Sequence, residues 1–211
     1  MPGEIQLDAL NTANCYIAPE LLRDYSFDAT VQGNGCATLN ITPQRLSGAY
    51  ARLVWETGTQ ANSVISSLGY DGSRIRFRTG TQQGNALIGL FNAGGECVWS
   101  WHIWVANYDP ESSAQKYSSG DIFMDRNLGT VGTDYTKVTA CGLYYQWGRK
   151  DPFVGAAALN STGTSYAATS NAPVGPQGPV PVSGLVYEQC QTRLIHLSRQ
   201  LRIRNDPSRR S

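Results

Sequence analysis

Short runs of alternating apolar and polar residues, separated by turn residues, fill the first half of the chain. The clearest run is Arg74-Ile-Arg-Phe-Arg-Thr, in which Ile75 and Phe77 would face a core while the arginines between them face water. Runs of this kind predict strands at 15–18, 24–31, 51–57, 63–68, 74–79, 84–91 and 97–105. Short strands at this spacing, with a Gly-Gly turn at 94–95, predict a mainly β protein with an antiparallel, Ig-like β-sandwich over residues 13–107.

The pattern changes after residue 108. Turn residues rich in serine and glycine surround a motif at 122–129, and a second motif follows at 141–153. Residues 155–184 are rich in Ala, Ser, Thr, Gly and Pro, which is typical of an extended loop. We therefore expect an N-terminal linker at 1–12, the sandwich at 13–107, a second and incomplete domain at 108–188, and a separate tail at 189–211.

The charge of the chain is unevenly distributed. The formal net charge is +1, but residues 189–211 hold six arginines and one acid, which leaves 11 basic and 15 acidic residues in 1–188. This mild acidity argues against a nucleic-acid partner for the body of the protein. We interpret the arginine-rich tail as a disordered end or as the product of a reading-frame shift, in preference to a basic arm for nucleic acid or an anionic membrane.

Cysteines and histidines give no metal-binding pattern. No two of the five cysteines form a CxxC pair, and His102 and His196 lie far from any such pair, so we expect no metal and no cofactor. Isolated buried thiols are favoured over a disulfide, with Cys15 and Cys36 as the first pair to test.

An apolar run of the roughly 20 residues that a membrane span needs is absent, and so is a signal peptide at the N-terminus. These observations leave a cytoplasmic protein or an internal piece of a longer exported chain.

The run Cys97-Val-Trp-Ser-Trp-His-Ile-Trp-Val is the most distinctive local feature. Trp99 and Trp101 share one face of the predicted strand, and His102 and Trp104 share the other. Exposed tryptophans would form a platform on which sugar rings stack, whereas buried ones would mark a central strand of the sandwich, which is the interpretation we favour. We expect His102 to be a packed, hydrogen-bonded side chain rather than a catalytic base.

Other candidate binding residues follow the sandwich. Tyr145 and Trp147 would serve as further stacking platforms for a sugar. The run from Trp147 through Arg149 to Asp151 is either a structural knot around a turn or a surface recognition loop. The run Asp125-Arg126-Asn127 places a carboxylate, a guanidinium and an amide beside apolar residues. Because buried charges are paired, we expect Asp125 and Arg126 to anchor loops rather than to bind calcium. Sequence motifs of nucleophile elbows, phosphate loops, HExxH helices and dinucleotide sites are absent, which argues against an enzyme.

Six motifs in order resemble those of a known family. They are Asn14-Cys-Tyr-Ile-Ala, Leu53-Val-Trp-Glu-Thr, Gly84-Asn-Ala-Leu-Ile, Trp99-Ser-Trp-His-Ile-Trp, Met124-Asp-Arg-Asn-Leu-Gly and Gly142-Leu-Tyr-Tyr-Gln-Trp-Gly-Arg-Lys-Asp-Pro-Phe. Together they resemble fimbrillin-type and fimbrial-tip-like surface lipoproteins of Bacteroidetes. The segment from Phe123 onward also resembles the opening of the major paralogous domain of Fibrobacter-type surface proteins, whose C-type-lectin-like fold is shared with formylglycine-generating enzymes.

The resemblance implies an α+β, C-type-lectin-like second domain and a location on the outer surface of the cell. It implies a non-catalytic role in adhesion or in a pilus, with other surface subunits or glycans as partners and with membrane anchoring only through an upstream lipoprotein signal. The family offers no active site to carry over, and the catalytic cysteines of formylglycine-generating enzymes have no matching motif here. Two alternatives stay open: a carbohydrate-binding module that uses its exposed aromatic residues, and a remnant of a glycan-active or formylglycine-generating-like enzyme.

Overall fold

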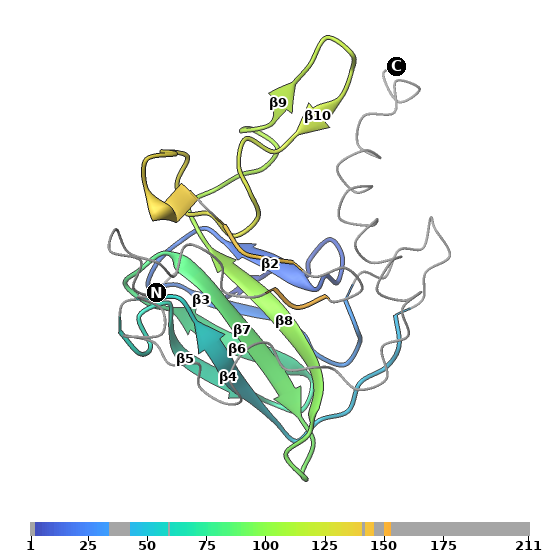
Figure 1. Cartoon of the computed structure of the whole chain (residues 1–211). Helices are drawn as coiled ribbons and strands as arrows, with labels where there is room; N and C mark the ends of the chain where they lie inside the picture. The colour runs from blue at the N-terminus through green and yellow to red at the C-terminus, as the bar shows by residue number, and fades with distance from the viewer. Residues whose placement is uncertain (1–2, 34–42, 59, 141, 146–149, 153–211) are drawn as a thin grey trace.

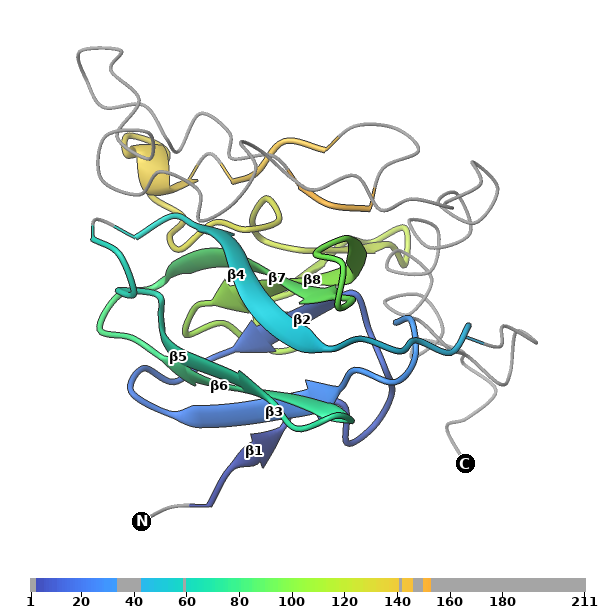
Figure 2. The ribbon, with the colours of Figure 1, turned by 90° about the horizontal axis from the view of Figure 1, so that it is seen from below.

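Two four-stranded β-sheets lie face to face in the computed structural model, which describes residues 3–33, 43–58, 60–140, 142–145 and 150–152 (Figure 1). The first sheet has the strand order β1-β3-β6-β5 and the second has the order β2-β8-β7-β4. Figure 2 shows the two sheets edge-on as separate layers. The strands of the first sheet are β1 (Ile5–Gln6), β3 (Asp24–Asp28), β6 (Arg74–Thr79) and β5 (Ile65–Tyr70). Those of the second are β2 (Cys15–Ala18), β8 (Cys97–Val105), β7 (Gly84–Phe91) and β4 (Tyr50–Glu56).

The sandwich-like, mainly β architecture agrees with the sequence, but the sheets are mixed rather than antiparallel. Strand β1 runs parallel to β3, and β2 runs parallel to β8. Both parallel strands come from the N-terminal part of the chain and occupy sheet edges, where no hairpin turn dictates their direction. Residues 5–6, which we expected to belong to a linker, form β1. The arginine-rich tail and the loop at 155–184 lie outside the described residues.

Side chains from both sheets meet between the layers and form the main core. The rings of Phe27 and Trp101 approach with centroids 5.1 Å apart, and Tyr16 stacks on Phe27 at the same separation. Ile75 and Phe77 of β6 are buried here while the arginines of that strand face outward, as the alternation predicts. Aromatic side chains of this size supply most of the apolar area that such a core removes from water.

A buried carboxylate joins the two layers at one side. Glu56, the last residue of β4, accepts hydrogen bonds from the backbone N–H groups of Val64 (3.3 Å) and Ile65 (3.0 Å), and also from Asn62. Burial raises the pKa of Glu56 above its ordinary value, and the backbone donors oppose that rise. The carboxylate thus closes the turn that carries the chain from β4 into β5.

The segment after β8 covers the outer face of the second sheet (Figure 2). Leu143 packs in a cluster with Trp55, and the ring of Trp104 lies 5.0 Å from that of Tyr108. Trp104 Nε1 also donates to the carbonyl oxygen of Thr130 at 3.0 Å. Strands β7 and β8 are therefore buried on both faces, which explains their almost continuous apolar sequences.

The covering segment itself contains little regular structure. It has the short strands β9 (Gln115–Lys116) and β10 (Ile122–Phe123) and the 3₁₀-helix η2 (Val138–Ala140). Within the described ranges this segment shows no α-helix, and its lectin-like character stays a prediction. In the same ranges, no helix has the length and the apolar character needed to cross a membrane.

Candidate functional site

The two tryptophans of the predicted sugar platform point into the core. Trp99 and Trp101 each have 0% of their surface exposed, and Trp99 Nε1 donates to Asn14 Oδ1 at 3.0 Å. A sugar ring has no access to either indole in this structure. The interpretation of this strand as a central one agrees with the geometry.

Of the further aromatic candidates, Tyr145 keeps exposed surface. It is 38% exposed, and its neighbour Tyr144 is 59% exposed. Burial of the phenol raises the pKa of Tyr145 above its ordinary value, with a smaller contribution from Cys15. Trp147 and Arg149 lie outside the described residues.

Asp125 and Arg126 pair with each other. Arg126 Nε donates to Asp125 Oδ1 at 2.8 Å and its Nη2 donates to Oδ2 at 2.9 Å, while the guanidinium lies 4.1 Å from the ring centroid of Tyr108. The arginine holds the pKa of Asp125 below its usual value. Beside the pair lies an open depression of about 300 Å³, lined in part by Asn127 and Tyr135. Because the two charges neutralise each other, this depression offers little charge to a ligand.

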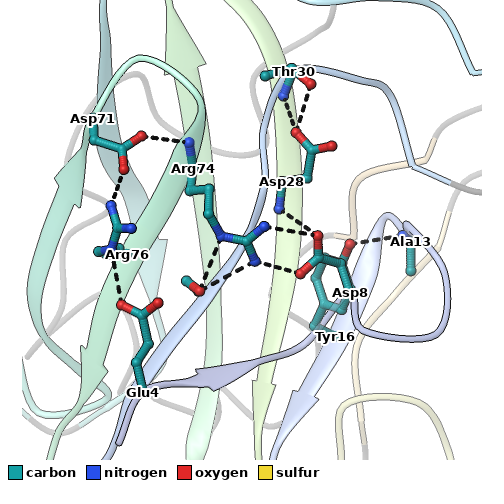
Figure 3. Close-up of polar contacts among 10 residues, drawn as sticks. Glu4, Asp8, Ala13, Tyr16, Asp28, Thr30, Asp71, Arg74 and Arg76 are labelled. Atoms are coloured by element: carbon teal, nitrogen blue, oxygen red, sulfur yellow. Dashed lines mark hydrogen bonds and ion pairs between the residues drawn. The ribbon is translucent and has the colours of Figure 1, made fainter.

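The arginines of β6 are also paired with carboxylates. Arg74 Nη2 lies 2.6 Å from Asp8 Oδ1, and Arg78 Nη1 lies 2.8 Å from Asp24 Oδ2. Arg76 bonds Glu4 at 3.0 Å and also bonds Asp71. Figure 3 shows how Glu4 and Asp8, from the N-terminal segment, reach across β3 to this row. The pairing supports a solvated strand face over an anion-binding site.

Strand β5 leaves one side unpaired at the end of the first sheet. Asp71 N–H donates to the Arg74 carbonyl oxygen at 3.2 Å, so the antiparallel alternation directs the backbone groups of Leu68 and Tyr70 away from β6. The Glu56 carboxylate accepts the outward-facing Ile65 N–H, which occupies the edge at the start of β5. Within the described ranges, no strand pairs with the edge beyond that residue. Residues 65–70 carry no charge. The last four residues of β5 are thus an open, uncharged sheet edge.

A buried serine, lysine and aspartate fasten residues 150–152 to β8. Ser100 Oγ donates to the Asp151 carboxylate at 2.8 Å, and Lys150 Nζ donates to the Ser100 carbonyl oxygen at 2.7 Å and also to Asp151. Both charged side chains are buried: that of Lys150 is 5% exposed and that of Asp151 is 4% exposed. Since the lysine is bonded to the aspartate, it is a poor base for the serine, and we interpret the cluster as a clamp.

Sequence reasoning missed a line of polar side chains on the outer face of the second sheet. Cys15 Sγ lies 3.1 Å from His102 Nδ1, and His102 Nε2 lies 2.9 Å from Asn85 Oδ1. Asn85 Nδ2 in turn donates to the carbonyl oxygen of Gly129 at 2.7 Å. The expectation that His102 is packed and hydrogen-bonded agrees with this arrangement. The one sequence feature that could have pointed to this line is that Asn85 and His102 are polar residues within otherwise apolar runs.

Burial sets the protonation states of this line. It raises the pKa of Cys15 to about 12 and lowers the pKa of His102 to about 3, with a smaller contribution from Lys150 to the second shift. At neutral pH the thiol keeps its proton and the imidazole is uncharged. Cys15 and His102 are therefore joined by a hydrogen bond between two uncharged groups.

No family model, no curated protein and no solved structure matches the chain. The resemblance to fimbrillin-type surface lipoproteins therefore stays a prediction that rests on the six motifs quoted above.

Proposed function

We propose that this protein is a non-catalytic cell-surface protein that acts in adhesion or in a pilus and binds its partner through the open edge of β5. The observation that carries the proposal is the unpaired side of residues 67–70. Outward-facing N–H and C=O groups of Leu68 and Tyr70 offer backbone hydrogen bonds to an added strand. Other surface subunits that present an extended, uncharged segment fit this edge, because β5 has no charge to repel or select one.

The side chains of β5 suit strand addition. Ser67 and Gly69 are small and exposed, so they leave room for a neighbouring backbone. Lysine or proline, which natural proteins use to block sheet edges, is absent from residues 65–70. A bulge at Ser66 interrupts the register near the start of the strand, which confines the added strand to the regular part that follows.

The substitution Gly69→Lys tests whether the open edge of β5 binds a partner strand. A side chain at Gly69 meets no atom within 4 Å, so Gly69→Lys places a charge at the edge without a clash. Gly3→Lys is the matched control, because Gly3 is equally open and lies next to β1 at the opposite end of the same sheet. The readout is adhesion and cell–cell aggregation by a non-adherent bacterium that displays the protein on its surface.

We expect the wild-type chain and Gly3→Lys to promote adhesion and Gly69→Lys to lose most of it. Gly69→Ser, which adds only a small side chain, should behave as wild type. Equal adhesion by Gly69→Lys would overturn the edge-binding proposal. A wild-type protein that promotes no adhesion would overturn the function itself.

In the described part of the chain, the carbohydrate-binding alternative is supported by the exposed surface of Tyr144 and Tyr145. A glycan array with the wild-type protein and with Tyr145→Ala separates it from the first proposal. Saturable binding that Tyr145→Ala abolishes, without a change in melting temperature, would favour a sugar ligand.

A further inference from the structure

We propose that Cys15 is a nucleophilic thiol that accepts an acyl group from an activated acyl donor, with His102 as its general base and Asn85 as the residue that orients the base. This inference goes beyond the adhesive function and does not depend on it. Its basis is the arrangement of three groups in line: thiol to imidazole at 3.1 Å, and imidazole to amide at 2.9 Å. A nucleophile, a base within hydrogen-bond reach and a third group that orients the base are the parts of a nucleophilic triad.

The direction of each hydrogen bond follows from the last one in the line. Asn85 Nδ2 is occupied as a donor to the Gly129 carbonyl oxygen, which leaves Asn85 Oδ1 as an acceptor toward His102. His102 therefore carries its proton on Nε2, and its Nδ1 has a free lone pair directed at the Cys15 thiol. The imidazole is set in the tautomer that a base for Cys15 requires.

The three residues stand on neighbouring strands that fix their positions. Cys15 and His102 are partners in the parallel pairing of β2 with β8, and His102 is opposite Leu87 in the pairing of β8 with β7. Asn85 lies two residues from Leu87, on the same face of the sheet as His102. Groups held by sheet backbone keep their geometry better than groups held by loops.

Hydrogen-bond partners distinguish Cys15 from the other free cysteine in the described part of the chain. Cys15 lies on the edge strand β2 with its thiol beside an imidazole, and the residue is partly exposed although the thiol itself is desolvated. Cys97 is buried, and its thiol donates to the Trp99 carbonyl oxygen at 3.3 Å. Cys97 has no imidazole within hydrogen-bond reach in the described residues. It serves as an internal control for thiol chemistry without a base.

The surroundings of the imidazole keep it uncharged over the pH range of the assay. The ring of Trp55 on β4 lies 6.5 Å from that of His102. Lys150, paired with Asp151, is the charged group that influences His102. With the pKa of His102 lowered to about 3, the neutral imidazole is present at every pH above about 4.

The acylation step balances without a further reactant. The Cys15 sulfur attacks the carbonyl carbon of the donor, and the thiol proton moves to His102 Nδ1. The bond from that carbon to the leaving group breaks, and His102 returns the proton to the leaving group. The products are a thioester on Cys15 and a protonated leaving group, with no oxidant or metal required.

The experiment treats the whole chain with 4-nitrophenyl acetate and follows acetyl transfer by mass spectrometry. Each of the five cysteines lies in a different tryptic peptide, so the site of acetylation is read directly. We expect acetylation of Cys15 well ahead of Cys97, and a rate that is constant between about pH 5 and about pH 9, because the base is neutral throughout. A rate at Cys15 that rises about tenfold per pH unit would show reaction through the free thiolate and would overturn the proposal.

Variants test the roles of the partners. His102→Gln should slow acetylation of Cys15 by roughly 10² or more, the usual contribution of a general base. Asn85→Ala should slow it less and leave Cys97 unchanged. The wild-type pH profile decides the question even if a variant fails to fold, and an unreactive Cys15 in the wild-type protein would overturn the proposal outright.

Discussion

Cys15 and His102 are direct partners in the parallel pairing of β2 with β8, although 87 residues separate them in the chain. The contact joins an N-terminal edge strand to one of the two inner strands of the second sheet. It also places a titratable imidazole, 4% exposed, in the interior of the protein. A buried neutral histidine makes the stability of the fold depend on pH.

Acidification should destabilise the protein through His102. The pKa of His102 is about 3 in the folded chain against an ordinary value of 6.5, so between these values the unfolded state binds a proton that the native state does not. The free energy of unfolding should therefore fall as the pH drops below 6.5, by up to about 1.4 kcal/mol per pH unit. Urea denaturation at a series of pH values measures this slope, and His102→Gln should flatten it. An unchanged slope in the variant would contradict the assignment.

Replacing a core tryptophan should cost far more than replacing an exposed tyrosine. Trp101→Ala removes a side chain with no exposed surface from between the sheets and should lower the free energy of unfolding by about 3–5 kcal/mol. Tyr145→Ala, at a partly exposed position, should cost about 1 kcal/mol or less. Chemical denaturation of both variants checks the difference. Similar losses for the two would mean that Trp101 is not a core residue.

The sequence predicts the strands of this fold where the side-chain period is visible over several residues. Arg74–Thr79 begins and ends as predicted, because alternation of arginines with Ile75 and Phe77 reports which face is buried. Strand β1 has two residues and no readable period, so it was missed. The parallel pairing of β2 with β8 depends on contacts between distant segments, which a local pattern does not encode.

The ion pairs of the arginine row should differ in strength according to burial. Asp8 is 11% exposed, bonds Arg74 through both oxygens and also accepts the Asp28 N–H at 3.0 Å. Asp8→Ala should therefore lower the free energy of unfolding by about 1–3 kcal/mol. Asp24 is 51% exposed in its pair with Arg78, and Asp24→Ala should cost about 0–1 kcal/mol. Thermal or urea denaturation of the two single variants checks this order, which equal losses would refute.

Of the candidate sites, those formed within one strand can be predicted from the sequence, and those formed by residues of several strands cannot. Trp99 and Trp101 are recognisable as a same-face pair within one strand, and their burial follows from the apolar run around them. The line from Cys15 through His102 to Asn85 draws one residue from each of three strands. Only the rule that buried polar groups need partners points to it beforehand, and that rule does not say which groups will meet.

Gly129 connects the covering segment to this line, and two glycines with similar backbone angles test the connection. Gly129 has φ +84°, and a Cβ there would lie 2.6 Å from Leu143 Cγ, whereas Gly120 has φ +87° and open space around it. Gly120→Ala should cost only the strain of a positive φ, about 1–2 kcal/mol. Gly129→Ala adds overpacking of roughly 1–3 kcal/mol and displaces the carbonyl that holds Asn85.

The two alanine variants should therefore separate in stability and in chemistry. Gly129→Ala should melt at a lower temperature than Gly120→Ala and should acetylate Cys15 more slowly, because a displaced Asn85 no longer orients His102. Differential scanning calorimetry and the acetylation assay measure the two effects on the same samples. If Gly129→Ala loses stability but acetylates at the wild-type rate, then Gly129 supports only the packing of Leu143 and not the orientation of the imidazole.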